Sequence, residues 1–180
     1  MLLGFLERPA LKWLCEHSPA WLTPDILTTI GLVAAGISFL GYLLSNLHPA
    51  YLLISSFGML LNWYGDSMDG SLARYRKIER PRYGFFVDHT LDAVAQLIFF
   101  LGFAASPYAR FDVAMTTLTV YYLMDILVLA RTSAQGEFKI TYGKIGPTEV
   151  RVLVILINTV LMFWNPAVNI SLREFRLYDV

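Results

Sequence analysis

The sequence predicts an all-α, polytopic integral membrane protein with five transmembrane helices and a preceding helix on the membrane surface. Hydrophobic residues make up 56% of the 180-residue chain, and its mean hydropathy is +0.53. Charged residues make up 16%, whereas an ordinary soluble domain has about 25%. Five long apolar segments follow one another, separated by polar or helix-breaking connections. We expect one membrane-embedded domain over residues 1–180.

The first 46 residues predict the surface helix and the first span. Residues 2–17 mix apolar and charged side chains around Pro9, which is typical of an interfacial helix. Thr23 is a favourable N-cap and Pro24 a favourable first helical residue, and about twenty apolar residues follow. Small residues favour close packing of this span against another helix; they are Gly31, Ala35, Gly36 and Gly41.

Four further spans are expected along the rest of the chain. The second continues without a break into a charged helical segment, which a basic connection and Pro81 end. The expected ranges are 50–64 with a continuation to 76, then 83–103, 113–130 and 148–164. These boundaries divide the domain into an interfacial region (1–20), a transmembrane bundle (21–165) and a polar tail (166–180).

Overall charge and cysteine content exclude several classes of function. The 14 Lys and Arg residues balance the 14 Asp and Glu residues, so bulk electrostatics favours no nucleic-acid partner. Cys15 is the one cysteine, which rules out an internal disulfide and a cysteine-based zinc site. The N-terminal apolar run is short, contains charges and lacks a small-residue cleavage site, so we expect no signal peptide.

The placement of Lys and Arg predicts the orientation in the membrane. Three basic residues, Arg110, Arg173 and Arg176, lie on one side, and eleven lie on the other. The eleven are Arg8, Lys12, Arg74, Arg76, Lys77, Arg80, Arg82, Arg131, Lys139, Lys144 and Arg151. We therefore expect the second side, which also carries the aspartates described next, to face the cytoplasm.

Four aspartates at helical spacing are the main chemical feature. Asp66 and Asp69 are three residues apart and Asp88 and Asp92 are four apart, so each pair shares one helix face. Four uncompensated carboxylates in a membrane would cost on the order of 10 kcal/mol. The two helices are consecutive, antiparallel and joined by a short connection, so the pairs can face each other. Such a cluster suits Mg²⁺, Mn²⁺ or Ca²⁺, and two ions could clamp a diphosphate.

Small residues accompany the aspartates on the same helix faces. Gly70 and Ala73 follow Asp66 at helical spacing, and Gly84 precedes Asp88 by one turn. They would leave room for a flat ligand beside the metal ions. The alternative interpretation of Asp66 or Asp69 taken alone, or of all four aspartates, is an interfacial salt bridge with arginines at a helix end.

This segment resembles the signature of the CDP-alcohol phosphotransferases, D-x2-D-G-x2-A-R, then eight or nine residues, then G-x3-D-x3-D. Nine residues separate the two halves here, and every signature position is filled: Asp66, Asp69, Gly70, Ala73, Arg74, Gly84, Asp88 and Asp92. Such enzymes move a phosphoalcohol or phosphatidyl group from a CDP-linked donor to an acceptor hydroxyl and release CMP. The resemblance implies phospholipid synthesis with Mg²⁺ or Mn²⁺, two ions, and a homodimer. Family members typically have six spans, so we expect a chain that is shortened or lacks its last helix.

The resemblance also implies roles for individual residues. The metal ligands would be Asp66, Asp69, Asp88 and Asp92, and Asp92 would also be a candidate base. The residues shaping the CDP pocket would be Asp66, Gly70, Ala73, Arg74 and Gly84. His89 directly follows Asp88, as in the choline/ethanolamine phosphotransferase branch, where this histidine can act as general base. The alternative is a packed or headgroup-facing histidine.

Several assignments stay open at this level. The donor is either a CDP-aminoalcohol or, as in sister branches, CDP-diacylglycerol with a small polar alcohol as acceptor. A divalent-cation carrier or sensor is the rival outside the enzyme class, but it predicts acids spread through the membrane depth. Asp25 either contacts the nucleotide or is a carboxylate that interacts favourably with the helix dipole at the start of its own helix. Asp125 either lines an acceptor cavity or bonds to a neighbouring hydroxyl, and Arg151, with Lys144 and Glu149, either binds an acceptor phosphate or anchors the helix.

Overall fold

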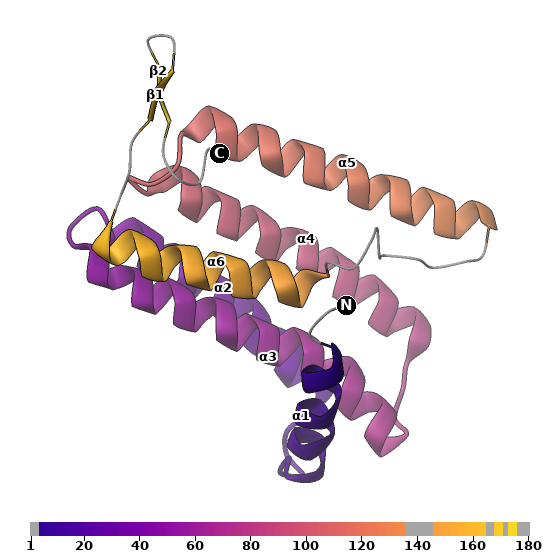
Figure 1. The fold of residues 1–180 in the computed structure, drawn as a ribbon. Helices are drawn as coiled ribbons and strands as arrows, with labels where there is room; N and C mark the ends of the chain where they lie inside the picture. The colour runs from indigo at the N-terminus through magenta and orange to yellow at the C-terminus, as the bar shows by residue number, and fades with distance from the viewer. Residues whose placement is uncertain (1–3, 136–145, 165–167, 171–172, 176–180) are drawn as a thin grey trace.

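The computed structural model describes residues 4–135, 146–164, 168–170 and 173–175, and within them the chain is a helical bundle (Figure 1). The helices are α1 Gly4–Glu16, α2 Pro24–Leu44, the 3-10 turn η1 Pro49–Tyr51, α3 Leu52–Arg76, α4 Pro81–Ala105, α5 Phe111–Gln135 and α6 Pro147–Phe163. The tail, expected only to be polar, contributes a short antiparallel pair, β1 Val168–Ile170 and β2 Arg173–Phe175.

Within the described residues, three helices are long and apolar enough to cross a membrane: α2, α4 and α5. The other two expected spans, α3 and α6, are helical but are not in this group. α3 ends in a charged segment, and α6 has 17 residues, at the short end of the range of lengths that span a bilayer.

Local sequence sets the ends of the helices around the aspartates. The Thr23 hydroxyl oxygen accepts a hydrogen bond from the Ile26 backbone N–H at 3.3 Å, and Pro24 opens α2, as expected. The C-cap of α3 is Lys77, which adopts a left-handed conformation with φ 56°. The Ile78 N–H then closes the turn by donating to the Ala73 carbonyl at 3.0 Å. Pro81 starts α4 four residues later, so the connection between the aspartate-bearing helices is short.

α2 is the common neighbour of the aspartate-bearing helices. It packs on both α3 and α4, while α6 and α1 pack on α3 and α5 packs on α4 (Figure 1). α3 and α4 are not a principal packing pair themselves. The two aspartate pairs are therefore brought together mainly through α2.

Glycine lets α2 and α3 approach to backbone contact. A Cβ on Gly58 would lie 2.5 Å from the Ser38 nitrogen, and one on Gly65 would lie 2.6 Å from the Gly31 nitrogen. Gly41 is equally close to Ser55. The expectation that Gly36 also serves this packing is wrong, because no atom lies within 4 Å of where its Cβ would be. Gly36 lies one residue, or about 100°, around the helix from buried Ala35 and so faces away from α3.

Two apolar clusters hold the bundle at its two ends. The cluster nearer the aspartates joins α1 to α2 and α3 through Cys15, Leu22, Leu27, Met68 and Leu72. Burial raises the pKa of the Cys15 thiol, which acts here as a small apolar side chain. At the other end the cluster is Tyr42, Leu52, Met59, Tyr108 and Leu161.

The glycine contacts predict a contrast between two alanine substitutions. Gly58→Ala forces the Cβ against the backbone of α2, so we expect a loss of about 1–3 kcal/mol in the free energy of unfolding. Gly36→Ala is the matched control; it enters open space and should leave stability unchanged or slightly raised. Unfolding of the purified protein in mixed detergent micelles measures both. Equal stability of the two variants would contradict the packing described here.

Candidate active site

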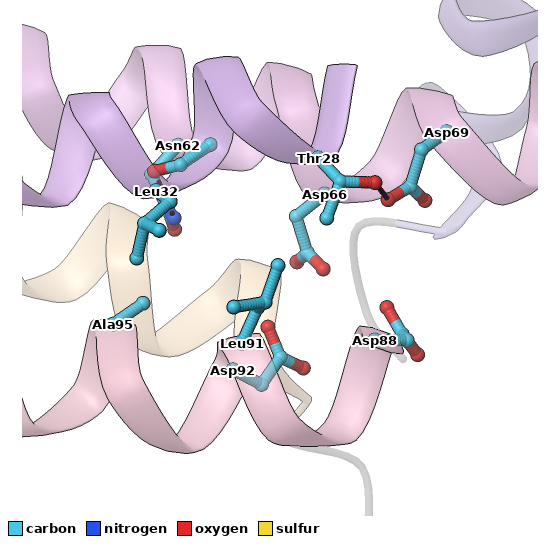
Figure 2. A pocket seen from close by; sticks show the side chains of 10 residues that line it. Thr28, Leu32, Asn62, Asp66, Asp69, Asp88, Leu91, Asp92 and Ala95 are labelled. Atoms are coloured by element: carbon cyan, nitrogen blue, oxygen red, sulfur yellow. Dashed lines mark hydrogen bonds between the residues drawn. The ribbon is translucent and has the colours of Figure 1, made fainter. Parts of the chain in front are cut away.

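A pocket between α2, α3 and α4 collects all four aspartates of the signature (Figure 2). Its lining residues are Thr28, Gly31, Leu32, Asn62, Asp66, Asp69, Asp88, Leu91, Asp92 and Ala95. The four carboxylates lie toward the end of α3 and the start of α4, near Thr28 of α2, whereas Leu32 and Ala95 lie toward the other end, beside Asn62 (Figure 2). The pocket thus has an anionic end and an apolar end.

Three of the aspartates form one compact group. Asp66 from α3 and Asp88 and Asp92 from α4 each present a carboxylate oxygen, and these oxygens lie within 4.8 Å of one another. In Figure 2 the three side chains point into the same space. An oxygen-only, strongly anionic donor set matches the preference of Mg²⁺ and Mn²⁺.

Asp69 lines the same pocket but is not in that group. The Thr28 hydroxyl donates to one of its carboxylate oxygens at 2.6 Å, and the Gly70 N–H donates to the other at 2.5 Å. These donors stabilise the Asp69 charge and fix its orientation. Thr28 is a site residue that the sequence interpretation missed; its signal was a hydroxyl one turn inside an apolar span.

Arg151 reaches the cluster from α6. Its guanidinium donates to an Asp66 oxygen at 2.8 Å, and the two side chains are only 18% and 22% exposed. The sequence left Arg151 open between a ligand contact and a membrane anchor, whereas the structure places it on a pocket carboxylate. Lys144, considered beside it, lies outside the described residues.

Asn62 is a second residue that the sequence interpretation missed. It is buried one turn before Asp66, and its side-chain N–H donates to the Gly31 carbonyl at 3.0 Å. Its amide oxygen is buried and has no hydrogen-bond partner among the residues that the structure describes. The lining of this pocket therefore combines carboxylates with a neutral oxygen acceptor, and such a donor set fits a divalent cation with its bound water.

The residues expected on the nucleotide side lie beside the aspartates. The Arg74 guanidinium covers Gly70, where a Cβ would lie 3.3 Å from Nη1, and it donates to Ser71 at 3.3 Å. No atom lies within 4 Å of the Cβ position at Gly84, and Ala73 is half-buried. Space for a flat ligand therefore remains beside Gly84.

His89 does not line the pocket, although it adjoins Asp88. Its Nδ1 lies 2.9 Å from the Phe85 carbonyl oxygen and 3.7 Å from an Asp88 oxygen. Its ring packs against that of Phe85, with centroids 4.2 Å apart. One step along a helix turns a side chain by about 100°, so His89 points to the side of the aspartate cluster.

Two further acids lie outside the pocket lining. Asp25 accepts a hydrogen bond from Arg80, which also stacks on Tyr83. Asp125 of α5 lies near Gln96 of α4, within the α4–α5 contact. Neither contact brings these carboxylates to the other four.

Comparison with known proteins agrees with this geometry. The sequence profile of the CDP-alcohol phosphatidyltransferase family matches residues 21–176. The chain belongs to this family. Together with the three apolar helices, this membership shows an integral membrane protein.

Curated relatives of the family differ in their named activities. Cholinephosphotransferase 1 of Danio rerio is 24% identical over 94% of this chain and 48% of its own length. Archaetidylinositol phosphate synthase of Pyrococcus horikoshii is 27% identical over 76% of this chain and 68% of its own. An uncharacterized protein of Aquifex aeolicus is 27% identical over 78% of this chain and 69% of its own length. The chain spans about half the length of the cholinephosphotransferases it matches.

The grouping of Asp66, Asp88 and Asp92 predicts the outcome of isosteric substitutions. Asp92→Asn removes one of three anionic ligands, so we expect Mn²⁺ affinity to fall at least tenfold, a change of about 1.4 kcal/mol. Asp112→Asn is the control, because Asp112 is exposed and paired with Arg110 at the start of α5. Titration of Mn²⁺ by electron paramagnetic resonance measures both. Unchanged affinity in Asp92→Asn would contradict a metal site at this cluster.

Proposed function

We propose that the protein is a metal-dependent transferase of phospholipid synthesis. It moves a phosphoalcohol or phosphatidyl group from a CDP-linked donor to an acceptor hydroxyl and releases CMP. The observation that carries this proposal is the convergence of Asp66, Asp88 and Asp92, from two helices, on one pocket. Their spacing matches the family signature, and the chain belongs to that family.

In this proposal the four aspartates bind the metal ions, and the small residues beside them admit the nucleotide. Asp66, Asp69, Asp88 and Asp92 are the ligands, and Gly70, Ala73, Arg74 and Gly84 shape the CDP pocket with Asp66. Bound Mg²⁺ or Mn²⁺, with two ions as the proposed number, would hold the diphosphate and offset its developing charge. Arg74 neutralises phosphate oxygens at the mouth.

The transfer forms a phosphoester bond to the acceptor and breaks the phosphoanhydride bond of the CDP-linked donor. The acceptor hydroxyl attacks the β-phosphorus, which carries the donor alcohol, and the bond between that phosphorus and the CMP oxygen breaks. The hydroxyl proton passes to His89 or to Asp92. Asp92 lies in the pocket, whereas His89 adjoins it through Asp88.

Two donors are consistent with the relatives' names. A CDP-aminoalcohol with a lipid acceptor is favoured by His89 and by the likeness to cholinephosphotransferase 1. CDP-diacylglycerol with a small polar alcohol is the alternative, and the likeness to archaetidylinositol phosphate synthase supports the use of a polar acceptor. Arg151 beside Asp66 is available to bind an anionic acceptor in that case.

The proposal also includes the arrangement of the helices in the membrane. We infer one domain with five spans, α2 to α6, and α1 on the cytoplasmic surface. The active site then opens near the cytoplasmic face, where water-soluble CDP compounds and CMP exchange. A homodimer is proposed from the family resemblance.

CMP release tests the function directly. Purified protein in lipid nanodiscs is given Mg²⁺ or Mn²⁺ with CDP-choline, CDP-ethanolamine or CDP-diacylglycerol, each with candidate acceptors. We expect metal-dependent CMP release with one donor class and a loss of at least 100-fold in Asp92→Asn. Asp112→Asn should retain full activity. No release with any donor, although Mn²⁺ binds, would instead favour the divalent-cation carrier or sensor.

A second comparison separates the two candidate bases. If His89 takes the proton, His89→Gln lowers turnover by about 100-fold while Mn²⁺ affinity stays unchanged, because His89 lies outside the aspartate group. Asp92→Asn lowers both quantities. Full turnover in His89→Gln would assign the proton to Asp92.

A further inference from the structure

Glu7 of α1 lies where three helices meet. Its Oε1 atom accepts hydrogen bonds from the Trp63 indole at 3.1 Å, the Ser67 hydroxyl at 3.3 Å and the Thr148 hydroxyl at 3.0 Å. Trp63 and Ser67 belong to α3, and Thr148 is in the first turn of α6. A single half-buried carboxylate thus joins α1, α3 and α6.

The residues that Glu7 holds are next to an ion pair in the site. Ser67 follows Asp66 on α3, and Thr148 precedes Arg151 by three residues on α6, which is nearly one turn. Arg151 and Asp66 bond to each other at 2.8 Å. Glu7 therefore fixes both segments that carry this pair.

Glu7 is not needed to attach α1 to the bundle. Cys15 and the apolar side chains beside it already pack on α3, against Met68 and Leu72. The far end of α6 is likewise anchored, because Leu161 is buried and Asn158 accepts a hydrogen bond from Tyr42 at 3.0 Å. What Glu7 adds is a link at the near end of α6, where Arg151 must reach the pocket.

We propose that Glu7 is a positioning residue, which holds the first turn of α6 on α3 so that Arg151 stays on Asp66. The inference rests on the metal site of the proposed function. A guanidinium on a metal-binding carboxylate opposes the binding of a second cation. Through this link, the surface helix α1 sets how tightly the aspartates bind a divalent ion.

Mn²⁺ affinity measured over a double-mutant cycle tests the proposal. Arg151→Gln removes the positive charge, so we expect Mn²⁺ to bind about tenfold more tightly. Thr148→Val and Glu7→Ala release Arg151 and should tighten binding about threefold, where general damage to the fold would weaken it. In the Thr148→Val/Arg151→Gln double variant, affinity should equal that of Arg151→Gln alone, because both changes act through one residue.

Matched controls lie on the same helices. Thr159→Val removes an exposed hydroxyl from α6 that donates to the Ile155 carbonyl of its own helix. Glu16→Ala removes an exposed carboxylate from α1 that pairs with Lys12. Both should bind Mn²⁺ as the wild type does.

Hydrogen exchange provides a readout that does not depend on metal or turnover. Glu7→Ala and Thr148→Val should raise amide exchange over residues 150–154 at least tenfold, while Arg151→Gln and both controls should not. Unchanged exchange, or additive effects of Thr148→Val and Arg151→Gln on affinity, would overturn the proposal. If wild-type protein binds no Mn²⁺, the metal site fails and with it the proposed control of affinity, whereas exchange alone still decides the link between Glu7 and α6.

Discussion

The close approach of α2 to α3 is the constraint on which the rest of the site depends. Gly65 contacts the backbone of α2 at Gly31, directly before Asp66. At this separation the Thr28 hydroxyl reaches Asp69 at 2.6 Å. α2 also packs on α4, which carries Asp88 and Asp92. A wider spacing would remove the Thr28 hydrogen bond and separate the two aspartate-bearing helices, because α2 is the element that both of them share.

The charge of the cluster is only partly offset by the protein. Arg151 pairs with Asp66, and hydroxyl and amide donors surround Asp69. These contacts hold individual carboxylates in place, but Arg151 brings a single formal positive charge to a group of four aspartates. Desolvated like charges repel strongly, so the remaining anionic character of the pocket suits a divalent cation. The repulsion between the carboxylates opposes their clustering, and a bound cation would offset it.

Basic residues near the site also fasten its supporting helices. Arg76, at the end of α3, donates to three backbone carbonyls of the turn between α1 and α2, those of Leu22, Ser18 and Pro19. Arg80 bonds to Asp25 at the start of α2. The basic residues used to predict the orientation in the membrane therefore also hold helices together. These arginines, with Glu7, connect α1, α2, α3, α6 and the start of α4.

The sequence by itself determined the helices, the shared face of each aspartate pair and the family, because helical periodicity and signature spacing are local properties. It could not show that Asp66 groups with Asp88 and Asp92 while Thr28 holds Asp69 apart. Nor could it show that Arg151 reaches Asp66, or that Gly36 faces open space while Gly58 lies in a helix contact. These features depend on the rotation and separation of helices distant in the chain. Only packing, summed over many weak contacts between such segments, decided them.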